Sequence, residues 1–241
     1  VGRAGGSLPT DELLDFRVAH ASAVDSVYAP LDMPELQSAI QELGCETICV
    51  ESAAPDRNTY LQRPDLGRQL DAASREALIQ CAGVNAAYDV ALIVSDGLSA
   101  TAAHRQAVPL LTKLVPQLAC SGYSVAPIAI VRHGRVAVED EIGAILGAKV
   151  ACILIGERPG LGTPDSLGAY IVYEPKQAKT NAQRNCVSNI RPEGLPFDEA
   201  AALLMYLIAQ ALRLKVSGIE LKDERGLLES AQEGKLFVSG C

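Results

Sequence analysis

Three short polar segments contain the residues of this chain that are best suited to bind a ligand. Each directly follows an apolar run, and they span residues 95–99 (SDGLS), 132–136 (RHGRV) and 156–162 (GERPGLG). Their glycines let the backbone approach a ligand closely, arginine donates to phosphate and carboxylate groups, and acidic side chains accept hydrogen bonds. If the apolar runs are parallel strands of one sheet, their carboxyl ends meet at one edge. The three segments then form one ligand-binding crevice.

Two known catalytic or cofactor motifs match these segments only in part. Gly160 and Gly162 begin a dinucleotide fingerprint, but Asp165 stands at the position of its third glycine. Ser95 with Gly97 resembles the nucleophile elbow of hydrolases, but the first glycine of that motif is missing. Because no carboxylate pair or nucleophile–base pair stands out, we expect no catalytic residue on this chain. A stand-alone nucleotide-binding Rossmann-like enzyme remains the alternative.

The spacing of apolar residues after residue 86 predicts the sheet that carries these segments. The expected strands are Val90–Val94, Ala126–Val131, Val150–Ile155 and Ala169–Tyr173. The expected helices are Val108–Leu118, started or kinked by Pro109, then Asp140–Leu146, and Asp198 to about Lys215. Short apolar runs that alternate with amphipathic stretches are typical of βα units. The sequence therefore predicts an α/β fold with a Rossmann-like, open and mainly parallel sheet.

The first 86 residues differ in composition and predict a smaller, mainly helical N-terminal domain. They carry 6 basic against 13 acidic residues, whereas residues 87–241 carry 15 against 16. The expected elements are a helix with Leu14, Val18, Ala21 and Tyr28 on one face, helices after Pro34 and from Asp65, and a short strand at Thr47–Val50. We therefore expect two domains, 1–86 and 87–241. Residues 223–241 are expected to form an appended helix or a frayed tail.

Composition excludes several classes of protein. Of the 241 residues, 49% are hydrophobic and 21% charged, which is typical of a folded globular protein. The net charge of −8 opposes binding to nucleic acid. No apolar run approaches the roughly 18 to 20 residues that span a bilayer, so no membrane association is expected. The seven scattered cysteines predict reduced thiols, and no metal site is expected. These features point to the cytoplasm, although the abrupt start leaves room for a leader that has been removed.

Several long motifs of the chain carry a specific resemblance. They are GRAG, YLQRPDLGRQL, SDGLSATA, VRHGRVAVEDEIG, LIGERPGLGTPDSLGAY, RNCVSNIRPEGL and SGIELKDE. In this order, up to about Lys222, they are similar to the small subunit of adenosylcobalamin-dependent ethanolamine ammonia-lyase. The resemblance implies a hetero-oligomer with a large TIM-barrel chain, six copies of each, with cobalamin bound where the two chains meet. It also implies radical conversion of ethanolamine to acetaldehyde and ammonia, and it suggests a bacterial microcompartment as the location.

The resemblance places the cobalamin contacts of this chain on three residues. They are Val136 in HGRV, Glu157 in IGERPG and Cys186 in RNCVSN. A corrin is a flat apolar disc edged with amides, so it needs apolar contacts and hydrogen-bonding partners at its rim. We expect Glu157 to accept from a corrin amide, Val136 to offer its backbone, and Cys186 to pack as a small soft side chain. The second region, 87–241, is then the cobalamin-contacting domain.

Four further residues of the same loops are candidates for cofactor or partner contacts. Asp96, Arg135, Arg158 and Asn189 suit rim amides, the nucleotide phosphate or the partner chain, and equally well suit ion pairs within this chain.

The surroundings of the histidines bear on how cobalt is ligated. Cobalamin mutases that bind cobalt through a protein histidine carry Asp-x-His-x-x-Gly, and none of the three histidines, His20, His104 and His133, lies in that context. His133 is expected to be a solvated turn residue. The resemblance thus implies base-on cobalamin, which keeps its own benzimidazole on cobalt. A purely structural subunit that only supports its partner is the remaining alternative.

Overall fold

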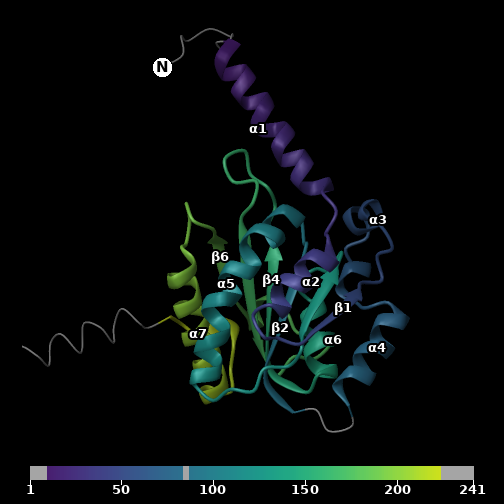
Figure 1. The fold of residues 1–241 in the computed structure, drawn as a ribbon, viewed down its shortest axis with the longest axis vertical. Helices are drawn as coiled ribbons and strands as arrows, with labels where there is room; N and C mark the ends of the chain where they lie inside the picture. The colour runs from purple at the N-terminus through teal and green to yellow at the C-terminus, as the bar shows by residue number, and fades with distance from the viewer. Residues whose placement is uncertain (1–9, 84–86, 224–241) are drawn as a thin grey trace, which may run out of the picture.

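A mixed six-stranded sheet forms the centre of the protein, with helices on both of its faces (Figure 1). The computed structural model describes residues 10–83 and 87–223. The strands are β1 (Thr47–Glu51), β2 (Tyr88–Ser95), β3 (Ile128–Arg132), β4 (Ala148–Gly156), β5 (Leu167–Tyr173) and β6 (Arg184–Ile190). Their order is β1-β3-β2-β4-β5-β6, parallel from β1 to β4 and antiparallel from β4 to β6. The α/β class is confirmed.

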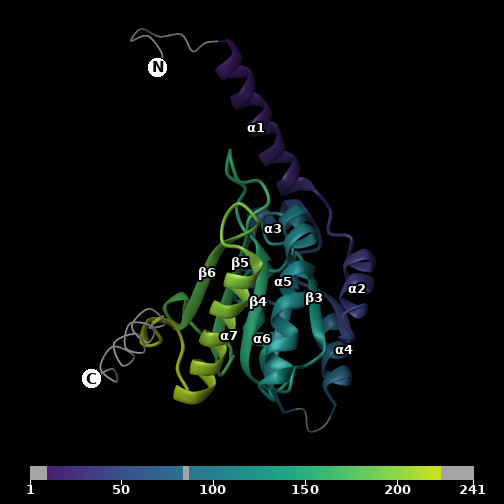
Figure 2. The same cartoon turned by 60° about the vertical axis from the view of Figure 1, so that its left-hand side comes forward.

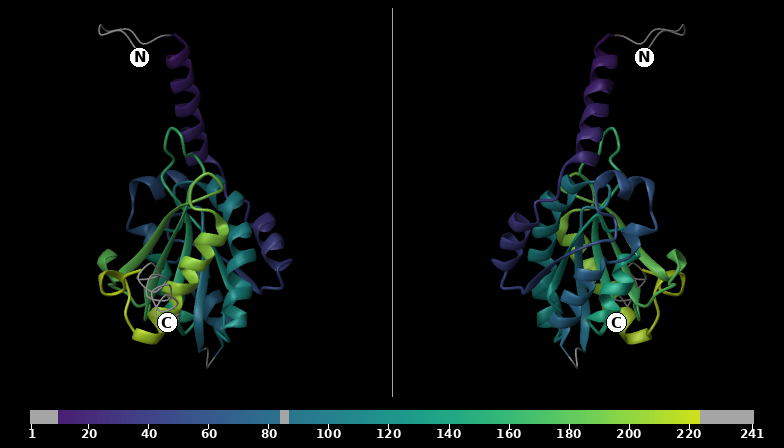
Figure 3. Two further views of the ribbon diagram at one scale, coloured as in Figure 1. Left: turned by 90° about the vertical axis from the view of Figure 1, so that its left-hand side faces the viewer. Right: turned by 90° about the vertical axis from the view of Figure 1, so that its right-hand side faces the viewer.

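Most of the helices pack an apolar side against this sheet. They are α1 (Thr10–Tyr28), α2 (Met33–Gln41), α3 (Arg57–Gln62), α4 (Ala72–Ala82), α5 (Ala100–Cys120), α6 (Val138–Ile145) and α7 (Phe197–Leu214). Helices α2, α5 and α7 share one apolar core with the sheet, and α4 and α6 share the other (Figures 2 and 3). The central strands read as continuous apolar runs because both of their faces are covered.

The strand at residues 169–173 does not have the parallel direction expected of it, although the sheet is otherwise mainly parallel. The run Ala169–Tyr173 lies in β5, which pairs antiparallel with β4. A parallel neighbour needs a crossover of a dozen or more residues, usually a helix. Only residues 157–166 join β4 to β5, and the structure assigns no helix there. The short connection therefore forces the chain to reverse.

Helix α5 is longer than its sequence pattern suggested. It begins at Ala100, capped by the Ser99 side chain, which accepts a hydrogen bond from the Ala102 N–H. Pro109 lies inside this helix and does not start it. The extension is explained by buried alanines, which continue the apolar side of α5 across the sheet.

The first 86 residues contribute to the sheet as well as to helices. The expected short strand is present as β1 and pairs with β3 in register, Thr47 opposite Ile128. The helix expected from Asp65 does not begin there, because a 3₁₀ turn at Leu66–Arg68 precedes α4. The sheet thus crosses residue 86, and the two-domain division stays a prediction that rests on charge and helix content.

Helix α1 projects from the body of the protein (Figures 1 and 3). The side chains expected on one of its faces point to solvent: Leu14 is 54%, Val18 68% and Tyr28 57% exposed. Within the described part of the chain, no helix is long and apolar enough to cross a membrane. The tail expected at residues 223–241 lies, after Asp223, outside the described residues, as do the GRAG motif and Cys241.

Candidate functional site

A crevice lies beside the carboxyl ends of the parallel strands, where the sequence places the polar segments. Its first part, here called the Glu157 pocket, has a volume of about 490 Å³. The residues that line it are Tyr60, Gly97, Leu98, Arg135, Val136, Ile155, Gly156, Glu157, Arg158 and Tyr170. Segments after β2, β3 and β4 therefore meet at one site, as ligand sites of open α/β sheets do.

A second hollow adjoins the first and is here called the Cys186 pocket. It also measures about 490 Å³ and shares Arg135, Val136 and Tyr170 with the Glu157 pocket. The other residues that line it are Arg68, Ala137, Lys179, Thr180, Asn181, Arg184 and Cys186. The structure thus brings Val136, Glu157 and Cys186 to two joined pockets.

Two glycines allow the loops after β2 and β4 to touch backbone to backbone. Gly97 has a φ of +52°, and the Leu98 N–H donates to the Gly156 carbonyl oxygen at 2.9 Å. A Cβ on Gly156 would lie 2.0 Å from the Ser99 carbonyl oxygen. No larger residue fits there without moving the backbone, so these glycines set the wall of the Glu157 pocket.

The Glu157 carboxylate is held in place by the neighbouring strands. Its oxygens accept hydrogen bonds from the Ser166 hydroxyl at 2.5 Å, from the Asn189 N–H at 3.1 Å and from the Ser188 hydroxyl. An ionised carboxylate offers about four acceptor positions. Glu157 therefore keeps about one acceptor position for a ligand. Asn189 acts here as a support for Glu157, the intrachain role left open by the sequence.

Cys186 lies opposite Tyr170 on adjacent antiparallel strands. Cys186 is exposed at the pocket, yet partial desolvation of its thiol raises the pKa, the Tyr170 hydroxyl opposes this shift, and the Glu157 charge adds to it. A raised pKa keeps the thiol protonated near neutral pH, which disfavours nucleophilic chemistry. The geometry suits Cys186 for packing against a ligand.

Val136 lies between the two pockets at the start of α6. Its side chain is half-buried against the α4–α6 side of the core, and its carbonyl oxygen accepts from the Glu139 N–H at 3.1 Å. That carbonyl therefore already has one partner, and Val136 offers the pockets an apolar surface.

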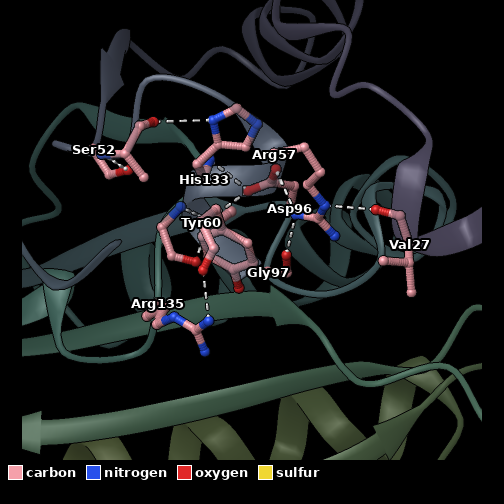
Figure 4. Close-up of polar contacts among 11 residues, drawn as sticks. Val27, Ser52, Arg57, Tyr60, Asp96, Gly97, His133 and Arg135 are labelled. Carbon is pink, nitrogen blue, oxygen red and sulfur yellow. Dashed lines mark hydrogen bonds and ion pairs between the residues drawn. The ribbon is translucent and has the colours of Figure 1, made fainter. Parts of the chain in front are cut away.

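An ion pair beneath the Glu157 pocket joins α3 to the loop after β2 (Figure 4). Asp56 caps α3, accepting from the Thr59 N–H at 2.8 Å, and so places Arg57 in the first turn. Arg57 donates to the Gly97 carbonyl oxygen at 2.7 Å and lies 3.4 Å from the Asp96 carboxylate. The sequence pattern gave no sign of Arg57, which is distant in sequence from all three polar segments.

Asp96 and His133 turn inward. Asp96 is only 2% exposed and accepts from the His133 N–H at 2.8 Å. Burial raises the pKa of Asp96, while Arg57 and His133 oppose the shift. His133 lies in a turn, as expected, but it is half-buried rather than solvated, and its Nδ1 lies 3.2 Å from the Ala54 carbonyl oxygen. The hydrogen bond between Asp96 and His133 thus holds the loops after β2 and β3 together.

Tyr60 and Arg135 form the boundary between this network and the pockets. The Arg135 guanidinium stacks on the Tyr60 ring at 4.5 Å and donates to the Tyr60 carbonyl oxygen at 2.8 Å. Burial raises the pKa of Tyr60 to about 12, against the effect of Arg135. The Arg135 Nε is buried without a partner among the described residues. In the sequence, Tyr60 was included only as part of the YLQRPDLGRQL motif.

The features expected of hydrolases and dinucleotide enzymes are missing from these loops as the structure describes them. Ser95 is fully buried and hydrogen-bonded to the backbone of Gly134, so no substrate can reach it. Gly160 and Thr163 close a turn through two mutual backbone hydrogen bonds, and the chain continues into β5. The connection between β4 and β5 therefore offers no helix N-terminus that could bind a pyrophosphate.

The chain has an α/β fold and a glycine-walled crevice, which offers several arginines and one free acceptor position on the Glu157 carboxylate. These features are typical of a ligand-binding protein. Residues 1–222 match the family described as "Ethanolamine ammonia-lyase light chain (EutC)". The chain is 51% identical over 225 residues to the ethanolamine ammonia-lyase small subunit of Pseudomonas fluorescens (strain Pf-5), covering 93% of this chain and 82% of that protein. It is 51% identical over 240 residues to the protein of that name from Ralstonia nicotianae (strain GMI1000), covering 98% and 89%. This chain belongs to the ethanolamine ammonia-lyase light-chain family.

Proposed function

We propose that this chain is the small subunit of an adenosylcobalamin-dependent ethanolamine ammonia-lyase and completes the cobalamin site beside a larger, TIM-barrel chain. Family membership supports the enzyme class. One structural observation carries the site: Val136, Glu157 and Cys186, which come from three separate segments, line two joined pockets. When bound, adenosylcobalamin supplies the radical that converts ethanolamine to acetaldehyde and ammonia.

The residues present fit a corrin. Leu98, Val136 and Ile155 give apolar contacts, and Glu157 keeps an acceptor position for a rim amide. The buried and unpartnered Nε of Arg135 needs an acceptor, which a ligand carbonyl or anion provides. These residues bind and orient the cofactor, while the substrate chemistry takes place mainly on the larger chain.

Base-on binding is the second part of the proposal. His104 accepts from the Asp32 N–H at 2.9 Å, and the His133 ring faces the Ala54 carbonyl oxygen. Neither histidine is among the described residues that line the two pockets. Both imidazoles thus have structural partners, which supports cobalamin that keeps its own benzimidazole.

Glu157→Ala is expected to weaken the affinity of the reconstituted two-chain complex for adenosylcobalamin about tenfold, because a charge-assisted hydrogen bond is lost. Titration followed by visible absorption measures this affinity. Ser188→Ala is the matched control, since it removes one support of Glu157 and leaves the carboxylate. If Glu157→Ala leaves the affinity unchanged, Glu157 does not bind the cofactor. If both variants lose the same affinity, Glu157 is a structural support only.

The exposed stripe of α1 supports docking of the larger chain. Leu14, Val18, Ala21 and Tyr28 form an apolar line on a helix that stands off the body. Residues spaced three and four apart on one side of a helix bind in an apolar groove, and Leu14, Val18 and Ala21 have this spacing. The light chain of a two-chain enzyme has a heavier chain to offer that groove, so we assign the stripe to it.

Val18→Glu is expected to weaken assembly with the larger chain about tenfold or more, because a charge replaces an apolar contact. Co-purification and the mass of the complex measure assembly, and also test the six copies of each chain. His20→Glu adds the same charge two residues away, about 200° round the helix, and is expected to assemble normally. If Val18→Glu assembles as well as the unaltered chain, α1 is not the docking element.

The composition of the chain supports a location in the cytoplasm, and the family resemblance adds a bacterial microcompartment as a place within it.

A further inference from the structure

The Cys186 pocket is strongly cationic. Arg68, Arg135, Lys179 and Arg184 line it, and no acidic residue is among the described residues that do so. The chain as a whole has a net charge of −8, so this concentration of positive charge is unlike the rest of the molecule. Like charges that share a site repel one another unless a counter-charge is present.

Within residues 10–83 and 87–223, one of the four cations has its counter-charge. Arg184 forms ion pairs with Glu139 at 2.7 Å and Asp140 at 2.6 Å. Among the described residues, no carboxylate lies within 4.0 Å of Arg68, Arg135 or Lys179. Three positive charges therefore face the pocket without a close negative partner.

The acidic groups near this pocket are already engaged, and Glu157, whose charge acts on Cys186, is held by Ser166, Ser188 and Asn189. Glu141 pairs with Arg75 at 2.5 Å, and Asp140 with Arg184. Glu174 is influenced by Lys179 but forms its ion pair with Lys176. Movement of a neighbouring carboxylate would break one of these ion pairs or hydrogen bonds, so the counter-charge is expected to come from a ligand.

The remaining groups of the pocket suit a tetrahedral oxyanion. Thr180 and Asn181 add polar side chains to the lining, and the volume of about 490 Å³ leaves room for a phosphate and its ester substituents. The buried and unpartnered Nε of Arg135 is a further donor at the border with the Glu157 pocket. Arg184 also donates to the Lys179 carbonyl oxygen at 3.2 Å, which fixes the backbone that carries Lys179.

We propose that the Cys186 pocket binds the phosphate diester in the nucleotide side chain of the cofactor, with Arg68, Arg135 and Lys179 as its binding residues. This inference rests on the proposed function. It divides the crevice in two: the Glu157 pocket contacts the apolar ring and its amides, and the Cys186 pocket neutralises the single negative charge. Arg184 is a positioning residue.

The test compares two corrinoids that differ only in phosphate, adenosylcobinamide and adenosylcobinamide phosphate. Both are titrated into the two-chain complex, and affinity is followed by visible absorption. The unaltered complex is expected to bind the phosphate-bearing form about tenfold or more tightly, as charge-assisted hydrogen bonds to an anion predict. The double variant Arg68→Ala/Lys179→Ala is expected to lose this preference while keeping its affinity for adenosylcobinamide. Both side chains reach solvent, so the variant is expected to fold.

Lys176→Ala is the matched control, because Lys176 is exposed, pairs with Glu174 and does not line the pocket. Its preference for phosphate should be unchanged. Equal binding of the two corrinoids by the unaltered complex, or a preference that survives in the double variant, overturns the proposal. Adenosine monophosphate serves as a third probe, and phosphate-dependent binding of it alone would assign the pocket to a free nucleotide instead. Failure of every corrinoid, adenosylcobalamin included, would instead refute the proposed function itself.

Discussion

Arg184→Met is expected to lower the free energy of unfolding by about 3–5 kcal/mol, the usual cost of removing one partner from a buried ion pair. Arg184 is 1% exposed at its side chain, and Glu139 is fully buried. The substitution leaves Glu139 and Asp140 side by side in the core with no cation to compensate them. Urea denaturation of the chain measures the change, and Arg213→Met, at an exposed arginine of α7, is the control, expected within about 0.5 kcal/mol.

The loss caused by Arg184→Met is expected to be larger at pH 8 than at pH 5. Burial already raises the pKa of Glu139 well above its ordinary value, with Arg184 opposing and Asp140 adding to the shift. A carboxyl whose pKa is higher in the folded than in the unfolded state binds more protons when folded, so stability falls as the pH rises through the raised pKa. Removal of Arg184 strengthens this effect. A loss that is independent of pH, or below about 1 kcal/mol, would contradict the account of the buried pair.

The strands of the sheet centre were predictable, whereas the direction and number of the strands at its β6 edge were not. Val90–Val94 and Val150–Ile155 are apolar because helices cover both faces, and such runs are visible in sequence. The antiparallel direction of β5 depends on the length of a connection that no periodicity reveals. The strand β6 (RNCVSNI) was missed because it is rich in polar residues and several of its side chains are exposed.

The candidate site was predictable in its loops but not in its supports. The segments after β2, β3 and β4 could be placed together because parallel strands end at one edge. Arg57 and Tyr60 come from α3, and their contacts with Asp96 and Arg135 depend on tertiary packing alone. Asp96 illustrates the difference: its position in a loop suggested ligand contact, while its burial against Arg57 makes it a support.

Gly156→Ala is expected to cost about 3 kcal/mol or more of stability and to weaken adenosylcobalamin binding by the complex at least tenfold. The added Cβ would lie 2.0 Å from the Ser99 carbonyl oxygen and 2.4 Å from that of Asp96. Both contacts are to backbone, so the whole loop after β2 must move. That movement breaks the hydrogen bond from the Leu98 N–H to the Gly156 carbonyl oxygen and opens the wall of the Glu157 pocket.

Gly162→Ala is the control for Gly156→Ala. It shows whether a methyl group near the connection between β4 and β5 has an effect apart from contact with the loop after β2. A Cβ on Gly162 would have no atom within 4 Å, so its stability is expected to change by less than about 0.5 kcal/mol. Thermal or urea unfolding compares the two variants, and titration with adenosylcobalamin compares their complexes. Unaltered stability and affinity in Gly156→Ala would refute backbone contact between the loops as the origin of the pocket wall. A stability loss without an affinity loss would show that the loop after β2 supports the fold but does not shape the cofactor site.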